Sequence, residues 1–316
     1  MQYNPDVQHS TQRAFVDAMV RHSGRFRNVI MLGSNVTVSA GLQNFEKAYP
    51  GRFFNFGDAV ENMFGAATGF TVRGKIPFVC SYGIAASGKS WDQVRNFICA
   101  SNLNVKIIGI DSGLLRGEEG TFHQALEDIA IMRALPNMKV VCPADGNETK
   151  KVVEAMIMDY GPTYLRLVNQ PLPDLYDEEG HRFVFGKGSI YKQGGDVCIF
   201  ALGIGVHMAL EAANLLEREG VSTMVINMAS VKPLDADLIV ECAKQIPNLV
   251  TVEDHNIIGG LGSAVSEVLT DRYPAKLLRI GMEGFGESGK VDDLFKKYRL
   301  DGAGIAEQVT EWMQKG

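Results

Sequence analysis

Residues 105–134, VKIIGIDSGLLRGEEGTFHQALEDIAIMRA, decide the fold class of this chain. The stretch begins with a short run rich in β-branched residues, continues through glycines and acids, and ends in apolar residues at helical spacing. This order predicts a buried strand over 105–111, then a loop, then a helix near 123–134. Because strand followed by helix is the repeating unit of a parallel sheet, the stretch indicates an α/β protein.

The same alternation extends outward in both directions. Further apolar runs predict buried strands over 28–33, 76–82, 138–142 and 163–167, and helical periodicity predicts helices near 11–22, 59–72, 91–101 and 147–159. Parallel neighbours need crossover connections, and the helices supply them. We therefore expect a doubly wound parallel sheet with helices on both faces.

A second unit follows an irregular stretch. Residues 169–183 gather proline, glycine and acids and lose the periodicity, as domain linkers do. Strand and helix patterns then restart over 196–203, 206–219, 221–228, 235–246, 249–253, 261–271, 276–280 and 302–314. We expect a first domain over 1–175 and a smaller α/β domain over 183–316.

Size and charge exclude several classes of protein. The chain has 316 residues, of which 46% are hydrophobic and 22% charged, so it is long enough for two domains of about 100 to 150 residues. Its 37 acidic residues outnumber its 31 basic ones, for a net charge of −6. This charge works against attraction to nucleic acid or to an anionic membrane. We expect neither partner.

The cysteines and histidines favour a cytoplasmic protein with no metal site of its own. The five cysteines lie far apart and form no C-x-x-C pair, which is typical of reduced thiols. The six histidines show no metal-binding spacing such as H-E-x-x-H. The chain also starts without a basic segment followed by an apolar run, and no stretch approaches about 18 uninterrupted apolar residues.

Three places are candidate sites on residue type alone. Residues 117–124 put two acids and His123 between a strand end and a helix, where open α/β sheets bind ligands, although a solvated loop has the same composition. Asp58 and Glu61 either belong to a site or complement the dipole of the next helix. His255 is either a ligand group or a satisfied imidazole. The glycine-rich pieces lack the full dinucleotide and P-loop patterns and are interpreted as turns.

A series of motifs over 12–271 resembles the C-terminal half of transketolase. The matching segments of the first domain are 53–63, 75–79, 91–96, 101–106, 123–130 and 135–138. In the second domain, VEDH at 252–255 and IGGLGSA at 258–264 resemble the C-terminal domain of the family. The β subunit of a 2-oxo acid dehydrogenase has a similar layout, but HQALED at 123–128 and LPNM at 135–138 favour transketolase.

The resemblance implies a pyrimidine-binding domain followed by the family's C-terminal domain. In the family, thiamine diphosphate lies between chains, with its aminopyrimidine on this type of domain. Its diphosphate and a Mg²⁺ ion lie on another domain, which carries a Gly-Asp-Gly motif. This chain has no Gly-Asp-Gly. The resemblance therefore implies a separate diphosphate-binding subunit and assembly into a heterotetramer.

The sequence departs from the family where the cofactor would bind. The family motif Gly-Ile-Ala-Glu-Gln-Asn-Met aligns with GDAVENM, which puts Val60 at the position of the catalytic glutamate and Glu61 one residue later. Adjacent helical side chains diverge by about 100°, so Glu61 reaches the pyrimidine only if the backbone shifts. The family's Phe-Ala-x-Phe pattern appears as YGIA, which keeps Tyr82 for stacking and leaves room at Ala85. We expect these four residues to bind the cofactor.

The substrate side departs as well. The resemblance implies that His123, which matches a family histidine, orients the substrate. Asp111, Glu119 and Asn169 stand at the positions of a family histidine, aspartate and arginine, and we expect all three to contact the substrate. Because Asp111 and Asn169 replace a donor and a cation, we expect weaker attraction for an anionic substrate than in the family.

Three further residues bear on the substrate. Ser39 matches a phosphate-contacting serine of the family. Arg166 matches an arginine of split transketolases and of the related deoxyxylulose phosphate synthases. We expect both to bind substrate. Arg116 is absent from the family pattern and either restores one positive charge or is a solvated surface residue.

The resemblance thus implies a subunit of a thiamine diphosphate dependent transferase. It would move a ketol or acyl unit between small carbohydrate-type substrates, with Glu61 and His123 as its catalytic residues and a partner chain completing the site. The alternative is a non-catalytic assembly or regulatory subunit that has kept the fold and lost the activating glutamate. Proton exchange at the thiazolium carbon would separate the two.

Overall fold

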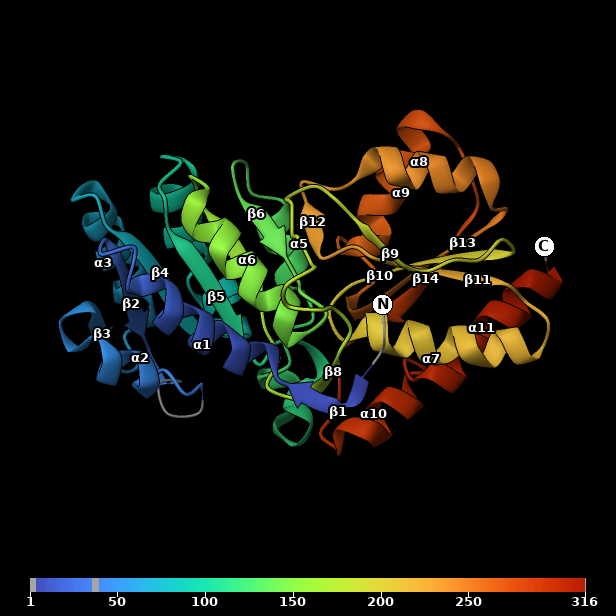
Figure 1. Cartoon of the computed structure of the whole chain (residues 1–316), viewed down its shortest axis with the longest axis horizontal. Helices are drawn as coiled ribbons and strands as arrows, with labels where there is room; N and C mark the ends of the chain where they lie inside the picture. The colour runs from blue at the N-terminus through green and yellow to red at the C-terminus, as the bar shows by residue number, and fades with distance from the viewer. Residues whose placement is uncertain (1–3, 36–39, 316) are drawn as a thin grey trace.

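The computed structural model describes residues 4–35 and 40–315 and contains two α/β units that lie side by side (Figure 1). The N-terminal unit, blue to green in Figure 1, holds the larger sheet, and the C-terminal unit, yellow to red, holds the smaller one. The predicted α/β class is confirmed. Ser39 lies outside the described residues.

The larger sheet has seven strands in the order β12-β6-β7-β5-β4-β2-β3. All neighbours pair parallel except β12, which runs antiparallel to β6. The chain places β3 on one side of β2 and β4 and β5 on the other, which is the doubly wound arrangement. The strands are β2 Val29–Gly33, β3 Phe53–Asn55, β4 Ile76–Tyr82, β5 Lys106–Ile110, β6 Lys139–Val141, β7 Thr163–Arg166 and β12 Ser230–Lys232.

Helices cover both faces of this sheet, as a parallel sheet requires. On one face, α3 contributes Met63 and Phe64 and α5 contributes Ile129 to a buried apolar cluster. On the other face, α1 contributes Phe15 and α6 contributes Val152. The helices are α1 Thr11–Ser23, α2 Gln43–Ala48, α3 Val60–Val72, α4 Trp91–Gln93, α5 Asp128–Arg133 and α6 Gly146–Met158.

Two helices are shorter than the sequence pattern predicted. The helix expected near 91–101 is the short α4, continued by π-helical turns over Val94–Cys99. The helix expected near 123–134 is α5, which begins later because 3₁₀ turns occupy Gly113–Phe122. Glycines interrupt the helical backbone inside these turns, since they adopt conformations that other residues rarely do.

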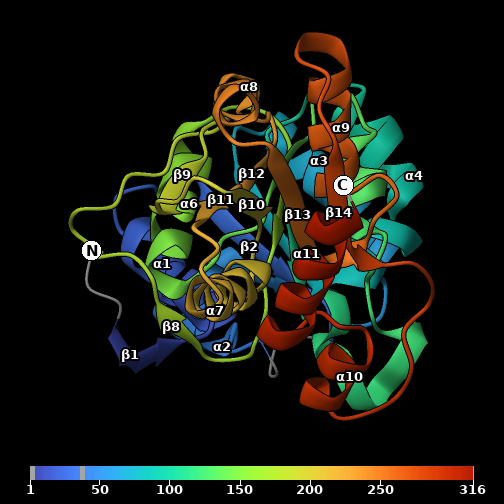
Figure 2. The same cartoon turned by 90° about the vertical axis from the view of Figure 1, so that its right-hand side faces the viewer.

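The smaller sheet has five strands in the order β14-β13-β10-β11-β9, with β9 antiparallel to β11. Figures 1 and 2 show α7 and α11 on one face of it and α8 and α9 on the other. The strands are β9 Ser189–Lys192, β10 Val197–Ala201, β11 Thr223–Asn227, β13 Asn248–Asn256 and β14 Leu277–Met282. The helices are α7 Gly205–Arg218, α8 Ala236–Gln245, α9 Leu261–Arg272, α10 Val291–Lys297 and α11 Gly302–Lys315.

Strands also join parts of the chain across the predicted linker. β12 belongs to the C-terminal half of the chain but extends the sheet of the N-terminal unit. β1 (Asn4–His9) pairs antiparallel with β8 (Leu172–Asp174), which lies inside the stretch interpreted as linker. The sequence pattern predicted neither these strands nor α2, β9 and α10. Most of them are short and are stabilised by partners distant in sequence, so local periodicity carries little trace of them.

Candidate active site

The predicted substrate residues lie at the carboxyl edge of the larger sheet. β5 ends at Ile110 and is followed at once by Asp111, and β7 ends shortly before Asn169. Because β5 and β7 are parallel neighbours, their carboxyl ends meet at one edge. Ligands of open α/β sheets bind at such an edge.

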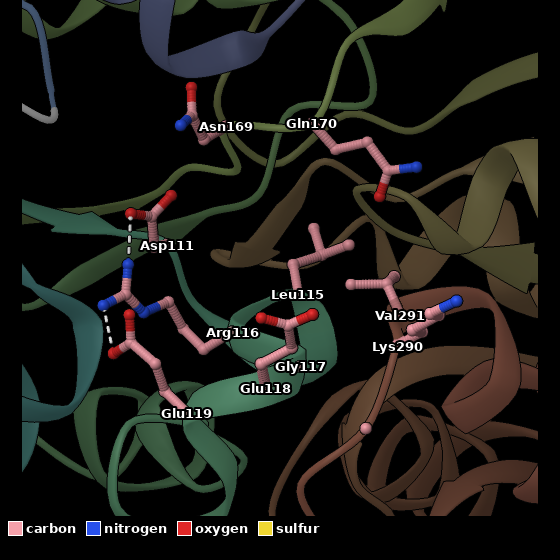
Figure 3. A pocket seen from close by; sticks show the side chains of 11 residues that line it. Asp111, Leu115, Arg116, Gly117, Glu118, Glu119, Asn169, Gln170, Lys290 and Val291 are labelled. Carbon is pink, nitrogen blue, oxygen red and sulfur yellow. Dashed lines mark hydrogen bonds and ion pairs between the residues drawn. The ribbon is translucent and has the colours of Figure 1, made fainter.

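A cavity of about 550 Å³ opens at this edge (Figure 3). It brings together three residues predicted from the sequence, namely Asp111, Glu119 and Asn169. The complete lining is Asp111, Leu115, Arg116, Gly117, Glu118, Glu119, Asn169, Gln170, Gly289, Lys290 and Val291. Both domains therefore contribute walls to the cavity.

The wall from the C-terminal domain was not predicted. The loop before α10 packs onto the 3₁₀ turns, where the N–H of Gly289 donates to the carbonyl of Gly117 over 3.2 Å. The hydroxyl of Thr121 donates to the carbonyl of Gly286 over 2.5 Å. The glycines of this loop indicate only a turn, and no local signal indicates what the turn will touch.

Arg116 lies at the centre of a set of side chains that we call the Arg116 cluster, made of Tyr82, Asp111, Arg116, Glu119 and His123. One guanidinium nitrogen of Arg116 lies 3.1 Å from Oδ2 of Asp111, and the other pairs with Glu119. The guanidinium carbon also lies 4.5 Å from the centroid of the Tyr82 ring. Arg116 is therefore held inside the site, which excludes the alternative of a solvated surface arginine.

Burial and ion pairing both act on the pKa of Asp111 and of Arg116. Burial raises the pKa of the Asp111 carboxyl group, and the guanidinium of Arg116 opposes this effect. Burial also works against the charge on Arg116, but its bonds to Glu119 and Asp111 raise its pKa. A single cation is thus shared between two carboxylates.

His123 stands at the outer side of the cluster. Its Nδ1 atom lies 3.5 Å from a carboxylate oxygen of Glu119, and its ring meets Tyr82 edge-on at 6.4 Å between centroids. Nearly half of the His123 side chain is exposed. The imidazole is therefore accessible to a bound molecule, while Tyr82 and Glu119 lie beside it.

The residues predicted to meet the cofactor do not supply a buried carboxyl group. Val60 is the first residue of α3, is only 6% exposed and packs in the same apolar cluster as Ala85. The next side chain, Glu61, is 40% exposed and lies 3.5 Å from Nζ of Lys89. At the start of α3 the buried side chain is thus that of Val60 and the exposed one that of Glu61. Glu61 therefore does not take the buried position of Val60.

Arg166 does not line the cavity. Its guanidinium lies 3.0 Å from Asp128 and 2.6 Å from Asp254, and only 2% of its side chain is exposed. Asp254 belongs to β13 of the C-terminal domain, so the ion pair joins the two domains. The substrate contact expected of Arg166 is not supported by this position, and the side chain instead fixes the domains behind the cavity.

His255 is a satisfied buried imidazole, which is one of the two alternatives that the sequence left open. Its Nε2 accepts a hydrogen bond from the N–H of Ala130 over 3.3 Å, and its Nδ1 donates to the carbonyl of Asn256 over 2.7 Å. The side chain is fully buried. It joins α5 to the C-terminal domain and does not reach the cavity.

Two kinds of feature are absent from residues 4–35 and 40–315. These residues contain no group of three or more His, Cys, Asp or Glu side chains arranged to hold a metal ion. None of their helices is long and apolar enough to cross a membrane.

Comparisons with known proteins identify the family. Residues 8–174 match the pyrimidine-binding domain of transketolase, and residues 186–305 match the transketolase C-terminal domain. The chain belongs to the transketolase family. Its two transketolase domains correspond to the two α/β units of the fold, and the cavity lies where they meet.

Two transketolase relatives match over nearly their whole length. One, named a putative transketolase C-terminal section, from Methanocaldococcus jannaschii, is 41% identical and covers 96% of both chains. The other, named 6-deoxy-6-sulfo-D-fructose transketolase subunit SqwH, from Clostridium sp., is 35% identical and covers 96% of this chain and 95% of its own. Both relatives are separate chains of about the present length.

A solved structure agrees in fold and extent. The chain described as a split gene transketolase in an inactive β4 tetramer superposes with a TM-score of 0.87. It is 39% identical and covers 96% of this chain and 97% of its own length. The present fold is thus shared with a split transketolase chain over nearly the whole length of both.

Proposed function

We propose that this chain is the second subunit of a split transketolase, which transfers a ketol unit between carbohydrate-type substrates. The single observation that carries the proposal is the polar cavity at the carboxyl edge of the pyrimidine-binding sheet, lined in part by the predicted residues Asp111, Glu119 and Asn169. The end-to-end match with chains named as transketolase sections or subunits supports it.

The chain requires a partner in this proposal. It lacks the Gly-Asp-Gly motif of the diphosphate-binding domain, so a separate subunit would hold the diphosphate and its Mg²⁺ ion. The cofactor cleft then lies between chains, and two copies of each subunit would form a heterotetramer. The word subunit in the name of the Clostridium relative supports this arrangement.

The predicted cofactor residues include side chains that can contact the ring of thiamine diphosphate, but they include no buried acid that could activate it. Val60 and Ala85 pack in one apolar cluster, and Tyr82, the last residue of β4, offers an aromatic ring for stacking. Bound thiamine diphosphate would supply the carbanion chemistry of the transfer. Val60 carries no carboxyl group, and the carboxyl group of the next residue, Glu61, is 40% exposed. We therefore derive no proton transfer through the cofactor.

The remaining residues would act on the substrate. His123 would accept a hydrogen bond at Nε2 from a substrate hydroxyl group, because the Nδ1 of a neutral imidazole carries the proton when it faces the carboxylate of Glu119. Asn169 would offer an amide donor and an acceptor at the cavity wall, on the same side as Asp111 in Figure 3. Arg116 would keep Asp111 and Glu119 in place, since it is bound to both.

One observation favours a second function. The aliphatic Val60, buried where the family has its catalytic glutamate, is the residue expected of a subunit that assembles without catalysing. Such a subunit would bind its partner chain with no activation of the cofactor.

Calorimetry of the assembled complex tests the proposal. Thiamine diphosphate and Mg²⁺ are titrated into this chain mixed with its diphosphate-binding subunit, and exchange of the thiazolium proton is then followed by NMR. Cofactor binding with proton exchange supports the enzyme subunit. Binding of the partner without proton exchange supports the assembly subunit. Absence of any complex with the partner contradicts both functions.

A further inference from the structure

The inner end of the cavity carries no free positive charge among the described residues. Both terminal nitrogens of Arg116 are bound, one to Asp111 and one to Glu119. Glu118 lies on the same wall, and its side chain makes no hydrogen bond or ion pair with another described residue. Lys290 lies on the far wall, and its amino group points away from Asp111 in Figure 3. The two carboxylates bound to Arg116 thus exceed its single positive charge, and Glu118 adds a third carboxylate to the cavity lining.

We propose that the cavity takes a polyhydroxylated substrate whose end at Asp111 is a hydroxyl group and not a phosphate ester, and that Asp111 determines this specificity. The inference rests on the proposed transketolase function and names the substrate class of that same site.

The geometry of Asp111 carries the inference. One carboxylate oxygen is bound to Arg116 at 3.1 Å, and Figure 3 shows the other oxygen turned away from Arg116. An ionised carboxylate accepts hydrogen bonds and donates none. The free oxygen can therefore accept from a hydroxyl group, whereas it repels the acceptor-only oxygens of a phosphate. The side chain is almost fully buried, so water screens this repulsion little.

The backbone at Asp111 adds a second observation. Its φ is +53°, a left-handed conformation that few residues other than glycine, asparagine and aspartate adopt readily. Residues held in such conformations cluster at functional sites, where the surrounding structure overcomes their cost. Here the ion pair with Arg116 holds the carboxylate at the cavity wall.

Matched sugars test the proposal on the complex of this chain with its partner subunit, thiamine diphosphate and Mg²⁺. Fructose is compared with fructose 6-phosphate, and xylulose with xylulose 5-phosphate, by kcat/KM and by calorimetric affinity. We expect the free sugar to be preferred at least tenfold in each pair. Asp111→Asn, which can donate a hydrogen bond, should reduce this preference at least tenfold. Asp237→Asn serves as the matched control and should reduce it less than threefold, because the Asp237 side chain is 84% exposed and lies on α8, outside the cavity lining.

The Arg116→Met variant distinguishes this inference from the opposite one, in which Arg116 binds a phosphate group of the substrate. If Arg116 recognised a phosphate, the wild type would prefer the phosphorylated sugar, and the substitution would abolish that preference. That result overturns the proposal. We expect the substitution to deepen the rejection of phosphate, because it removes the cation from between two carboxylates.

The measured affinities test the substrate class independently of the proposed transketolase function. If the complex turns over none of the sugars, the transketolase function fails, and the affinities still decide the substrate class. Tighter binding of the phosphorylated sugars, or no binding of either member of a pair, overturns the inference. An unchanged preference in Asp111→Asn also overturns it.

Discussion

Two adjacent residues at the start of α3 differ sharply in burial: Val60 is buried and aliphatic, and Glu61 is an exposed acid. Val60 packs in a buried apolar cluster, whereas Glu61 points toward Lys89 at the surface. A carboxyl group buried in such a place would have a raised pKa and could exchange a proton near neutral pH. The exposed Glu61 has no such environment.

Val60→Glu should therefore accelerate exchange of the thiazolium proton in the assembled complex at least tenfold, because it installs a buried carboxyl group where the family has one. Glu61→Gln should change the exchange rate less than twofold. Both rates are measured by deuterium exchange and NMR with cofactor and partner present. A large loss in Glu61→Gln would show that Glu61 is the activating acid after all.

At the scale of elements, buried charges fix the position of β7 and β13 behind the cavity. Arg166 at the end of β7 bridges Asp128 of α5 and Asp254 of β13. Gly113 lies against the same carboxylate, where a Cβ atom would collide with Asp254. The 3₁₀ turns that line the cavity are thus built directly onto this ion-pair network.

Arg166→Met should destabilise the chain by about 3 to 5 kcal/mol, because it leaves two buried carboxylates without their cation. The matched control is Arg272→Met, which breaks an ion pair with Asp237 that is largely exposed. It should cost less than about 1 kcal/mol. Urea denaturation measures both values. Equal losses in the two variants would contradict the role assigned to the buried network.

Lys106 in β5 makes the stability of the fold depend on pH. At the start of β5, its amino group donates to the carbonyls of Asp159 and Gly161 over 3.0 and 2.7 Å, and burial lowers its pKa to about 7. In the unfolded chain the pKa is near 10.4, so between pH 7 and 10 the unfolded state binds more protons. Stability contributed at this site should therefore rise with pH, by at most about 1.4 kcal/mol per pH unit.

Lys106→Met removes this titration. The free energy of urea unfolding of wild type and variant is compared at pH 7, 8 and 9. The difference between them should shift in favour of the wild type as the pH rises. A difference that is independent of pH would show that Lys106 keeps its charge in the folded chain.

At the scale of the whole molecule, the cavity is flanked by exposed aromatic surface. Phe122, next to His123, is 88% exposed, and Phe285, one residue before the Gly286 carbonyl that accepts from Thr121, is 74% exposed. Exposed aromatic side chains beside a site that we propose a second chain completes are typical of an interface.

Phe122→Ser should weaken binding of the diphosphate-binding subunit at least tenfold, because a large aromatic side chain beside the shared cleft would no longer be buried on association. Met158→Ser is the control, since Met158 is also well exposed, at 70%, but ends α6 away from the cavity. Surface plasmon resonance measures both affinities. Similar losses in both variants would place the partner elsewhere.

How much of this could be predicted depends on where the information lies in the chain. The alternation of strand and helix is local, so β4, β5, β7, α3 and α6 follow from spacing alone. Asp111, Glu119 and Asn169 could be placed at one edge because parallel strands present their carboxyl ends together. The motifs that resemble transketolase were correct for the family.

By itself, the sequence determined the α/β class, the two units, the family and the absence of a glutamate at Val60. Only the tertiary structure decided that Arg116 is neutralised between Asp111 and Glu119, that Arg166 joins the domains, and that the loop before α10 closes the cavity. The physical reason is that periodicity and capping are local, whereas ion pairs and cavity walls arise between segments far apart in the chain. Which charges cancel is settled only when the fold brings them within a few ångströms.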